Sequence, residues 1–142
     1  MSAPPLELRC LTPELCVAGQ IDPTDLPAIA EAGFGSVICN RPDGEQPDQP
    51  SWQAIEQAAL QQGLRFAHLP VVGGLINAQQ VQEFERLLAS LPGPILAYCR
   101  SGQRCTVLWV YSQARHQAWP ELLEQAARAG YDLRALAPPP QS

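Results

Sequence analysis

The residues best able to do chemistry form the segment CRSGQRC, from Cys99 to Cys105. A compact apolar run, Pro94 to Tyr98, precedes it, and an apolar stretch follows it. This order places a cysteine at the end of a buried strand, then a glycine-containing loop, then an arginine at the start of a helix. It favours anion binding, because the loop N–H groups, the helix N-terminus and the guanidinium are all positive there. The same groups stabilise a thiolate, so Cys99 is predicted to be a nucleophile at neutral pH. The alternative is an inert thiol buried at a strand end.

The residues between these two cysteines have predicted supporting roles. Arg104 offers a planar fork of N–H groups for an anion. Arg100 and Ser101 are predicted to steer and bind an anionic small-molecule substrate, although loop positions that face solvent would explain both residues as well. Gly102 supplies a backbone conformation that a side chain would hinder, and Gln103 completes the anion-binding loop.

Two further segments contribute candidate site residues. Asn40, Arg41 and Asp43 belong to NRPDGEQPDQP, a long connection over residues 40–50 that follows an apolar strand. Long ordered loops often serve a site, and the carboxyl ends of parallel strands meet at one edge of a sheet, so this loop could reach Cys99. A surface turn is the alternative for Arg41. His68 ends a later strand and is either a proton donor or a partly buried structural histidine.

The cysteine content favours free thiols. The chain has five cysteines, an odd number, and no CxxC pair of the zinc-binding kind; they are Cys10, Cys16, Cys39, Cys99 and Cys105. In a reducing compartment this pattern predicts unpaired thiols. The first three are predicted to fill space in the core. Cys105 either packs in the first turn of a helix or forms a regulatory disulfide with Cys99.

The charge distribution excludes some classes of protein. The net charge is -5, and all nine basic residues are arginine. A mostly acidic surface argues against a general nucleic-acid binder or a binder of anionic membranes. Residues 1–56 carry a net charge of -7, residues 57–120 of +3 and residues 121–142 of -1. The span from Arg86 to Pro120 has four arginines and no acid, so we expect surroundings of Cys99 that lack carboxylates and favour a thiolate.

The chain length and the hydrophobic pattern predict one domain in the cytoplasm. A chain of 142 residues suits a single domain over residues 1–142, with its core over about residues 6–136 and a proline-rich tail over residues 137–142. No apolar run approaches the length of a membrane span, and the first residues lack the pattern of a secretion signal. We therefore expect a cytoplasmic protein that does not span the membrane.

Short apolar runs alternate with amphipathic stretches, as is typical of an α/β domain. A hairpin is predicted from residues 6–10 and 15–18, and further strands over 36–39, 64–69 and 94–98. Asp22 is predicted to cap a helix that ends at Gly33, and Asn77 to cap another that carries Phe84 on its apolar face. The remaining helices are predicted over residues 52–62, 105–116 and 120–129.

Three segments, AYCRSGQRCTVLW, CNRPDGEQPDQPSW and LTPELCVAGQI, resemble the phosphatase-like domain of bacterial beta-lactamase-hydrolase-like proteins. The resemblance covers about residues 6–136. It implies the fold of protein tyrosine and dual-specificity cysteine phosphatases, in which helices flank a central, mostly parallel sheet. Family members occur alone or fused to sulfide-oxidising partners, including persulfide dioxygenases, so it also implies such an enzyme as a partner.

The resemblance leaves two reactions open. Cysteine phosphatases use His-Cys-x5-Arg-Ser/Thr, whereas only four residues separate Cys99 from Arg104 here, and Tyr98 stands in place of the histidine. The shorter loop resembles that of single-domain rhodaneses. The aspartate that protonates the leaving group in dual-specificity phosphatases also has no counterpart, since no Asp or Glu occurs between Glu56 and Glu83.

These two observations favour a rhodanese-like sulfurtransferase, which moves sulfur from thiosulfate or a low-molecular-weight persulfide through a persulfide on Cys99. The alternative is a cysteine-dependent protein tyrosine or dual-specificity phosphatase, with a phosphocysteine at Cys99. The third possibility is a non-catalytic module that binds anions. No metal and no organic cofactor is expected for any of the three.

Overall fold

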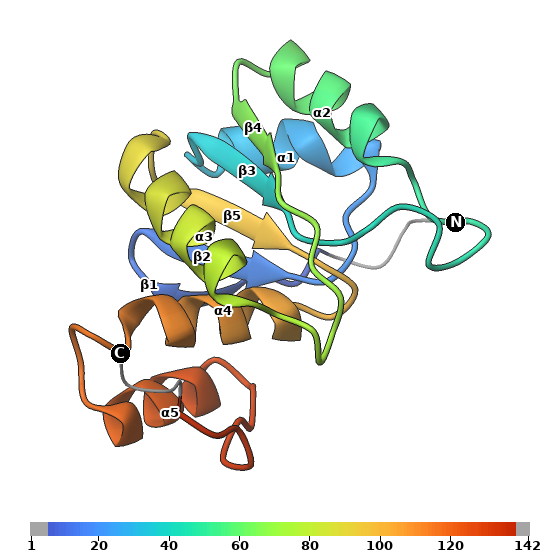
Figure 1. Ribbon diagram of the computed structural model, residues 1–142. Helices are drawn as coiled ribbons and strands as arrows, with labels where there is room; N and C mark the ends of the chain where they lie inside the picture. Colours follow the sequence, from blue (N-terminus) through green and yellow to red (C-terminus); the bar gives the residue numbers. More distant parts are fainter. Residues whose placement is uncertain (1–5, 139–142) are drawn as a thin grey trace.

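A five-stranded sheet forms the centre of the molecule (Figure 1). The computed structural model describes residues 6–138. The strand order is β1-β2-β5-β3-β4; β1 and β2 form an antiparallel hairpin, and the other neighbours are parallel. The strands are β1 (Arg9–Thr12), β2 (Leu15–Ala18), β3 (Ser36–Cys39), β4 (Arg65–His68) and β5 (Ile95–Tyr98). The predicted α/β class with a mostly parallel sheet is therefore confirmed.

Helices cover both faces of this sheet (Figure 1). One face packs against the short 3-10 turn η1 (Pro23–Asp25), α1 (Leu26–Glu31) and α2 (Trp52–Gln61). The opposite face packs against α3 (Ala78–Ser90), α4 (Gln103–Gln113) and α5 (Trp119–Arg128). The result is a three-layer arrangement with a hydrophobic core on each side of the sheet.

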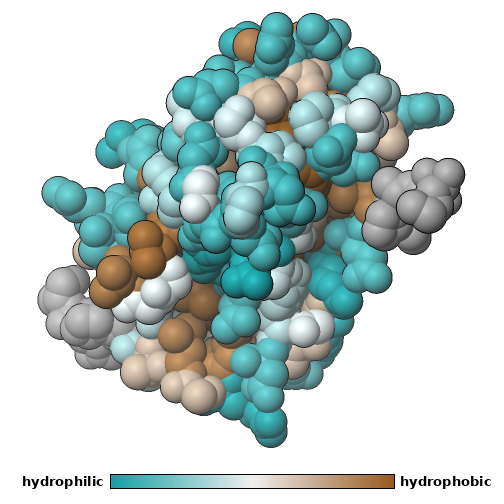
Figure 2. Space-filling view, turned by 90° about the vertical axis from the view of Figure 1, so that its right-hand side faces the viewer, coloured by the Kyte–Doolittle hydropathy of each residue, from teal (hydrophilic) through white to brown (hydrophobic). Residues whose placement is uncertain are grey.

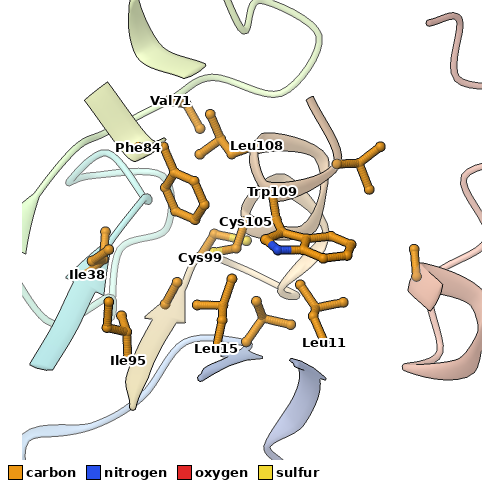
Figure 3. Packing of buried hydrophobic residues seen from close by; sticks show 14 of the residues in the cluster. Leu11, Leu15, Ile38, Val71, Phe84, Ile95, Cys99, Cys105, Leu108 and Trp109 are labelled. Carbon is orange, nitrogen blue, oxygen red and sulfur yellow. The ribbon is translucent and has the colours of Figure 1, made fainter. Parts of the chain in front are cut away.

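Strand β5 lies in the middle of the sheet and is buried on both faces, which explains its continuous apolar sequence. Ile95 and Ala97 belong to the core beneath α3 and α4, whereas Leu96 and Tyr98 belong to the core beneath α1 and α2. Figure 3 shows the first of these cores, with Cys99 at the end of β5 beside Cys105 of α4. Cys99 thus directly follows a central strand whose residues are all buried.

Most predicted elements are confirmed, with small shifts of their boundaries. Asp22 and Asn77 both cap the elements that follow them, as predicted, and the structure has a capping box at each. β1 begins at Arg9, later than predicted, and α4 begins at Gln103, before the predicted Cys105. The segment after Asp22 divides into η1 and α1 rather than forming one helix. The predicted tail over residues 137–142 lies mostly outside the described residues.

The prediction of five free thiols is wrong for two cysteines. Cys10 and Cys16 lie directly opposite each other in the β1–β2 hairpin and form a disulfide. Hairpin register decides which side chains face each other, and the sequence did not fix that register. Cys39, Cys99 and Cys105 are free and buried.

No helix among residues 6–138 is long and apolar enough to cross a membrane.

Candidate active site

The site lies at the carboxyl edge of the parallel strands, where the chain leaves β5. Backbone hydrogen bonds bind this point to both neighbouring strands: the Cys99 N–H donates to the carbonyl of Ala18 at 3.2 Å, and the Asn40 N–H donates to the carbonyl of Tyr98 at 2.8 Å. The loop over residues 40–50 follows β3 and therefore begins beside the cysteine loop, as predicted. Figure 2 looks onto the side of the molecule where these loops lie.

Cys99 is fully buried, and its sulfur is surrounded by hydrogen-bond donors. The Gly102 N–H donates to Sγ at 3.1 Å. A hydrogen bond from the Cys105 side chain has the largest effect, and backbone N–H groups of the loop act in the same direction. Together they outweigh burial and lower the pKa of Cys99 to about 5. Cys99 is therefore a thiolate at neutral pH, held ready to attack an electrophile.

Cys105 remains a thiol, because complete burial and the neighbouring Cys99 raise its pKa well above the ordinary value. Of the two predicted alternatives, the structure contains the packed thiol of a first helical turn. Its side chain lies next to Cys99 (Figure 3) and donates a hydrogen bond to it. This cysteine thus supports the nucleophile directly.

Gly102 has the backbone conformation that the sequence predicted for it. Its φ is 91°, in the left-handed region that favours glycine, and it forms the N-cap of α4. A Cβ atom at this position would collide with the hydroxyl of Tyr131. That hydroxyl donates to the carbonyl of Ser101 at 3.0 Å, so a residue from the end of the chain fixes the loop.

Arg104 is held by a carboxylate from the loop after β3. Its Nη1 and Nη2 donate to Glu45 Oε2 and Oε1 at 2.9 and 2.8 Å, and Nη1 also donates to the carbonyl of Val71 at 2.9 Å. Glu45 Oε1 also accepts from Nε of Arg41 at 2.9 Å. The hydrogen bond from Arg104, supported by Arg41, lowers the pKa of Glu45 to about 2. Glu45 is therefore a carboxylate at neutral pH.

The other loop residues are exposed around a hollow of about 480 Å³. Arg100, Ser101 and Gln103 line it together with Arg104. Its remaining lining comes from the loop after β4, from α4 and from the end of the chain, and consists of Gly73, Gly74, Ile76, Val107, Tyr111 and Leu136. The structure thus brings the predicted anion-binding residues to one surface depression.

The predicted site residues in the loop after β3 have structural contacts that differ from one another. Arg41 is only 1% exposed, so it is no surface turn. Asn40 is buried and donates from Nδ2 to the carbonyl of Leu69 at 2.8 Å, which ties the ends of β3 and β4 together. Asp43 accepts from the N–H of Trp52 at 2.9 Å, at the start of α2.

His68 lies against the ring of Trp52, with 4.3 Å between the ring centroids. Burial lowers the pKa of His68 below its ordinary value, so the ring is neutral at neutral pH. Its Nε2 is buried and has no hydrogen-bond partner among the described residues. This geometry favours the structural alternative for His68 over a proton donor.

The sequence reasoning missed Glu45, and the expectation that no carboxylate lies near the nucleophile is wrong. The span from Arg86 to Pro120 has no acid of its own, but Glu45 from the distant loop contacts Arg104 directly. A signal was present, since Glu45 follows Arg41 by four residues in the most acidic part of the chain. Tyr131 was also missed, and nothing in its sequence context indicated the contact.

The nucleophilic cysteine follows the central strand of a mostly parallel sheet, and the loop after it points N–H groups at its sulfur and ends at an arginine near the start of a helix. This arrangement places the protein in the class of cysteine-phosphatase-like α/β domains. More narrowly, the chain belongs to the family described as the phosphatase-like domain of beta-lactamase hydrolase-like protein, which residues 7–116 match. A beta-lactamase hydrolase-like protein of Xylella fastidiosa is 36% identical over 99 residues, which are 70% of this chain and 23% of that protein. The chain thus spans about a quarter of the length of this relative.

Solved structures agree with this placement. A Neisseria meningitidis protein, provisionally assigned as a phosphatase, is 35% identical and superposes with a TM-score of 0.83, covering 89% of this chain and 91% of that one. The core catalytic domain of a PP-IP phosphatase from S. cerevisiae is 17% identical, with a TM-score of 0.71 over 95% of this chain and 83% of that one. The second similarity concerns the fold alone.

These findings overturn the expectation of a rhodanese-like sulfurtransferase. The family is described as phosphatase-like, and the similar solved structures carry phosphatase assignments rather than sulfurtransferase ones. The expectation rested on the four-residue spacing of Cys99 and Arg104 and on the absence of an acid between Glu56 and Glu83. The number of residues in a loop does not by itself set its radius, because backbone angles such as the positive φ of Gly102 also decide where the N–H groups point.

Proposed function

We propose that this domain is a cysteine-dependent phosphatase that hydrolyses phosphomonoesters, the alternative that the sequence left open. The observation that carries the proposal is the Cys99 thiolate, which accepts the Gly102 N–H in a loop that ends at Arg104. A thiolate of low pKa attacks phosphorus efficiently, and loop N–H groups with a guanidinium match the oxygens of a phosphoryl group. The similarity to phosphatase-like proteins supports the same reaction.

The reaction has two steps. Sγ of Cys99 forms a bond to phosphorus while the ester P–O bond breaks, so that the electron pair leaves with the alcohol oxygen, which water protonates. Water then attacks the phosphocysteine, the S–P bond breaks, and inorganic phosphate and the thiolate are released. Arg104 and the loop N–H groups bind the phosphoryl oxygens in both steps and stabilise the charge that develops on them.

The leaving group would occupy the hollow beside the loop. Apolar side chains from three segments form much of this hollow, namely Ile76, Val107, Tyr111 and Leu136. An aryl group could pack against this apolar part of the lining, while Arg100 and Arg104 line the rest of the hollow. We therefore propose aryl phosphomonoesters, including phosphotyrosine side chains, as the substrate class.

Within the described part of the chain, the site has no proton donor for the leaving oxygen. Glu45 is ionised and bound by two arginines, and His68 is neutral at neutral pH. The sequence also has no Asp or Glu between Glu56 and Glu83. Solvent would therefore supply the proton, which favours substrates whose alcohol leaves readily as an anion.

The test is phosphate release from p-nitrophenyl phosphate and from a phosphotyrosine peptide. The wild-type domain should release phosphate from both, and Cys99→Ser should lose the activity while keeping the melting temperature of the wild type. Cys39→Ser is the matched control, because Cys39 is also a buried free thiol but lies at the end of β3, and it should keep its activity. Equal activity of Cys99→Ser and the wild type would refute the proposal.

A cytoplasmic location also remains a proposal. A nucleophilic thiol needs a reducing compartment to stay active, and Cys39, Cys99 and Cys105 are free. The Cys10–Cys16 disulfide is the feature that such a compartment would not favour. Alkylation of thiols in intact cells, followed by mass spectrometry, would measure how much of this pair is oxidised there.

A sulfide-oxidising enzyme as a partner of this domain stays a prediction.

A further inference from the structure

The hydrogen bonds of Arg104 divide its guanidinium into two edges. A guanidinium has five N–H groups, one on Nε and two on each Nη. The two N–H groups on Nη1 donate to Glu45 and to the carbonyl of Val71, and one of the two N–H groups on Nη2 donates to Glu45. The Nε–H and the second Nη2–H have no partner among the described residues. These two N–H groups lie on the same side of the guanidinium and form a second fork that can bind two oxygens.

We infer that Glu45 is a positioning residue that holds one edge of Arg104 so that the other edge, Nε and Nη2, receives the phosphoryl oxygens. The inference rests on the proposed function, since it assigns Arg104 to the phosphoryl group. The nearby Cys99 thiolate helps to raise the pKa of Arg104, after the larger effect of Glu45, so the guanidinium lies within electrostatic reach of the nucleophile. Arg104 is 14% exposed in its side chain, which limits the other directions that it could take.

Glu45 can serve this purpose because a buried cation holds it in turn. Arg41 is almost completely buried, and its Nε donates to Glu45 Oε1 at 2.9 Å. Its Nη1 and Nη2 donate to the side-chain oxygens of Gln20 and Gln46 at 2.9 and 3.1 Å. A buried charge is tolerated when it is paired and hydrogen-bonded in this way. Arg41, Glu45 and Arg104 therefore form a chain of alternating charges from the interior to the site.

The loop over residues 40–50 is folded so that it presents Glu45 at this position. The Glu45 N–H donates to Gln49 Oε1 at 3.1 Å, and Gln49 Nε2 donates to the carbonyl of Pro42 at 2.8 Å. Asp43 fixes the other side of the loop to the start of α2 through the Trp52 N–H. The carboxylate is thus held by its own loop as well as by the arginines.

A competing possibility is that Glu45 occupies the anion site and inhibits the domain. The two possibilities predict opposite effects of removing the charge. If Glu45 competes with substrate, Glu45→Gln should bind phosphate more tightly. If Glu45 positions Arg104, Glu45→Gln should bind phosphate more weakly, because a freed guanidinium loses its orientation and a misplacement of about 1 Å can cost about 100-fold in rate.

The experiment measures kcat/KM for p-nitrophenyl phosphate and the inhibition constant of inorganic phosphate. For Glu45→Gln we expect kcat/KM to fall and the inhibition constant to rise, each by about 10- to 100-fold, and for Glu45→Asp a partial effect. Glu83→Gln is the matched control, because it breaks an exposed ion pair with Arg86 on α3 and should change neither value. The pH profile of Cys99 alkylation by iodoacetamide should stay near that of the wild type.

The outcomes separate a failure of the inference about Glu45 from a failure of the proposed phosphatase function. Unchanged or tighter phosphate binding by Glu45→Gln, in a protein with the wild-type melting temperature, would overturn the inference. If the wild type itself released no phosphate from aryl esters, the proposed function would fail first. Isothermal titration with inorganic phosphate would then still compare the wild type with Glu45→Gln, since positioning of Arg104 predicts weaker binding by the variant whatever the reaction.

Discussion

Replacing Cys105 by alanine would remove the group that contributes most to ionising the nucleophile. The Cys105 side chain donates to Cys99, and its thiol is fully buried beside it (Figure 3). A hydrogen bond to a charged group contributes about 1.5–3 kcal/mol. One pKa unit corresponds to about 1.4 kcal/mol, so we expect the pKa of Cys99 to rise by about 1–2 units in Cys105→Ala, from about 5 to about 6–7.

The effect should be measurable in mildly acidic solution, where the two pKa values give different thiolate fractions. At pH about 5.5, a thiol with a pKa of about 5 is about three-quarters ionised, whereas a pKa of about 6–7 leaves about 3–25% ionised. The rate of iodoacetamide alkylation of Cys99 follows this fraction. We therefore expect alkylation at this pH to slow by about 3- to 25-fold in Cys105→Ala, measured by mass spectrometry of the peptide that contains Cys99.

Two controls make the measurement specific. Cys105→Ser keeps a donor at this position, so its alkylation profile should stay closer to that of the wild type. Cys39 is an internal reference, because burial raises its pKa and it should not react in this pH range. An unchanged alkylation profile in folded Cys105→Ala would refute the account of how the thiolate is stabilised.

Three further predictions follow from the same geometry. Since no group among residues 6–138 is placed to protonate the leaving oxygen, kcat/KM should fall steeply from p-nitrophenyl to phenyl phosphate; equal values would indicate that a group of the protein donates the proton. Gly102→Ala forces a side chain into the left-handed region and against Tyr131, so it should lower stability by about 1–3 kcal/mol in urea unfolding, and a neutral result would contradict the described loop. Folding lowers the pKa of Glu45 from about 4.5 to about 2, so its contribution to stability is complete above pH 4.5 and is lost as the pH falls toward 2. Unfolding of Glu45→Gln should therefore depend less on pH over this range, and identical pH dependence would count against the ion pairs.

Local patterns made most of the fold predictable. Strand β5 could be recognised because it is buried on both faces and consists of apolar residues only. The helix starts at Asp22 and Asn77 could be recognised because capping is a contact between residues two or three positions apart. The cysteine loop was found for the same reason, since its chemistry lies within seven consecutive residues.

Contacts between distant segments could not be predicted in this way. The pairing of Glu45 with Arg104 joins positions 59 residues apart, and it depends on β3 and β5 being neighbours in the sheet. The disulfide of Cys10 and Cys16 depends on the register of a hairpin. The reaction could not be predicted from the spacing within the cysteine loop, because backbone angles such as the positive φ of Gly102 also shape the pocket.

The central claim, that Cys99 carries a phosphoryl group during catalysis, can be tested by rapid quenching. The domain is mixed with p-nitrophenyl phosphate, stopped in acid within milliseconds, digested and analysed by mass spectrometry. The account predicts that the peptide with Cys99 gains the mass of one phosphoryl group, and that this species disappears as substrate is exhausted. Turnover of the substrate without any phosphorylated Cys99 in the quenched samples would contradict it.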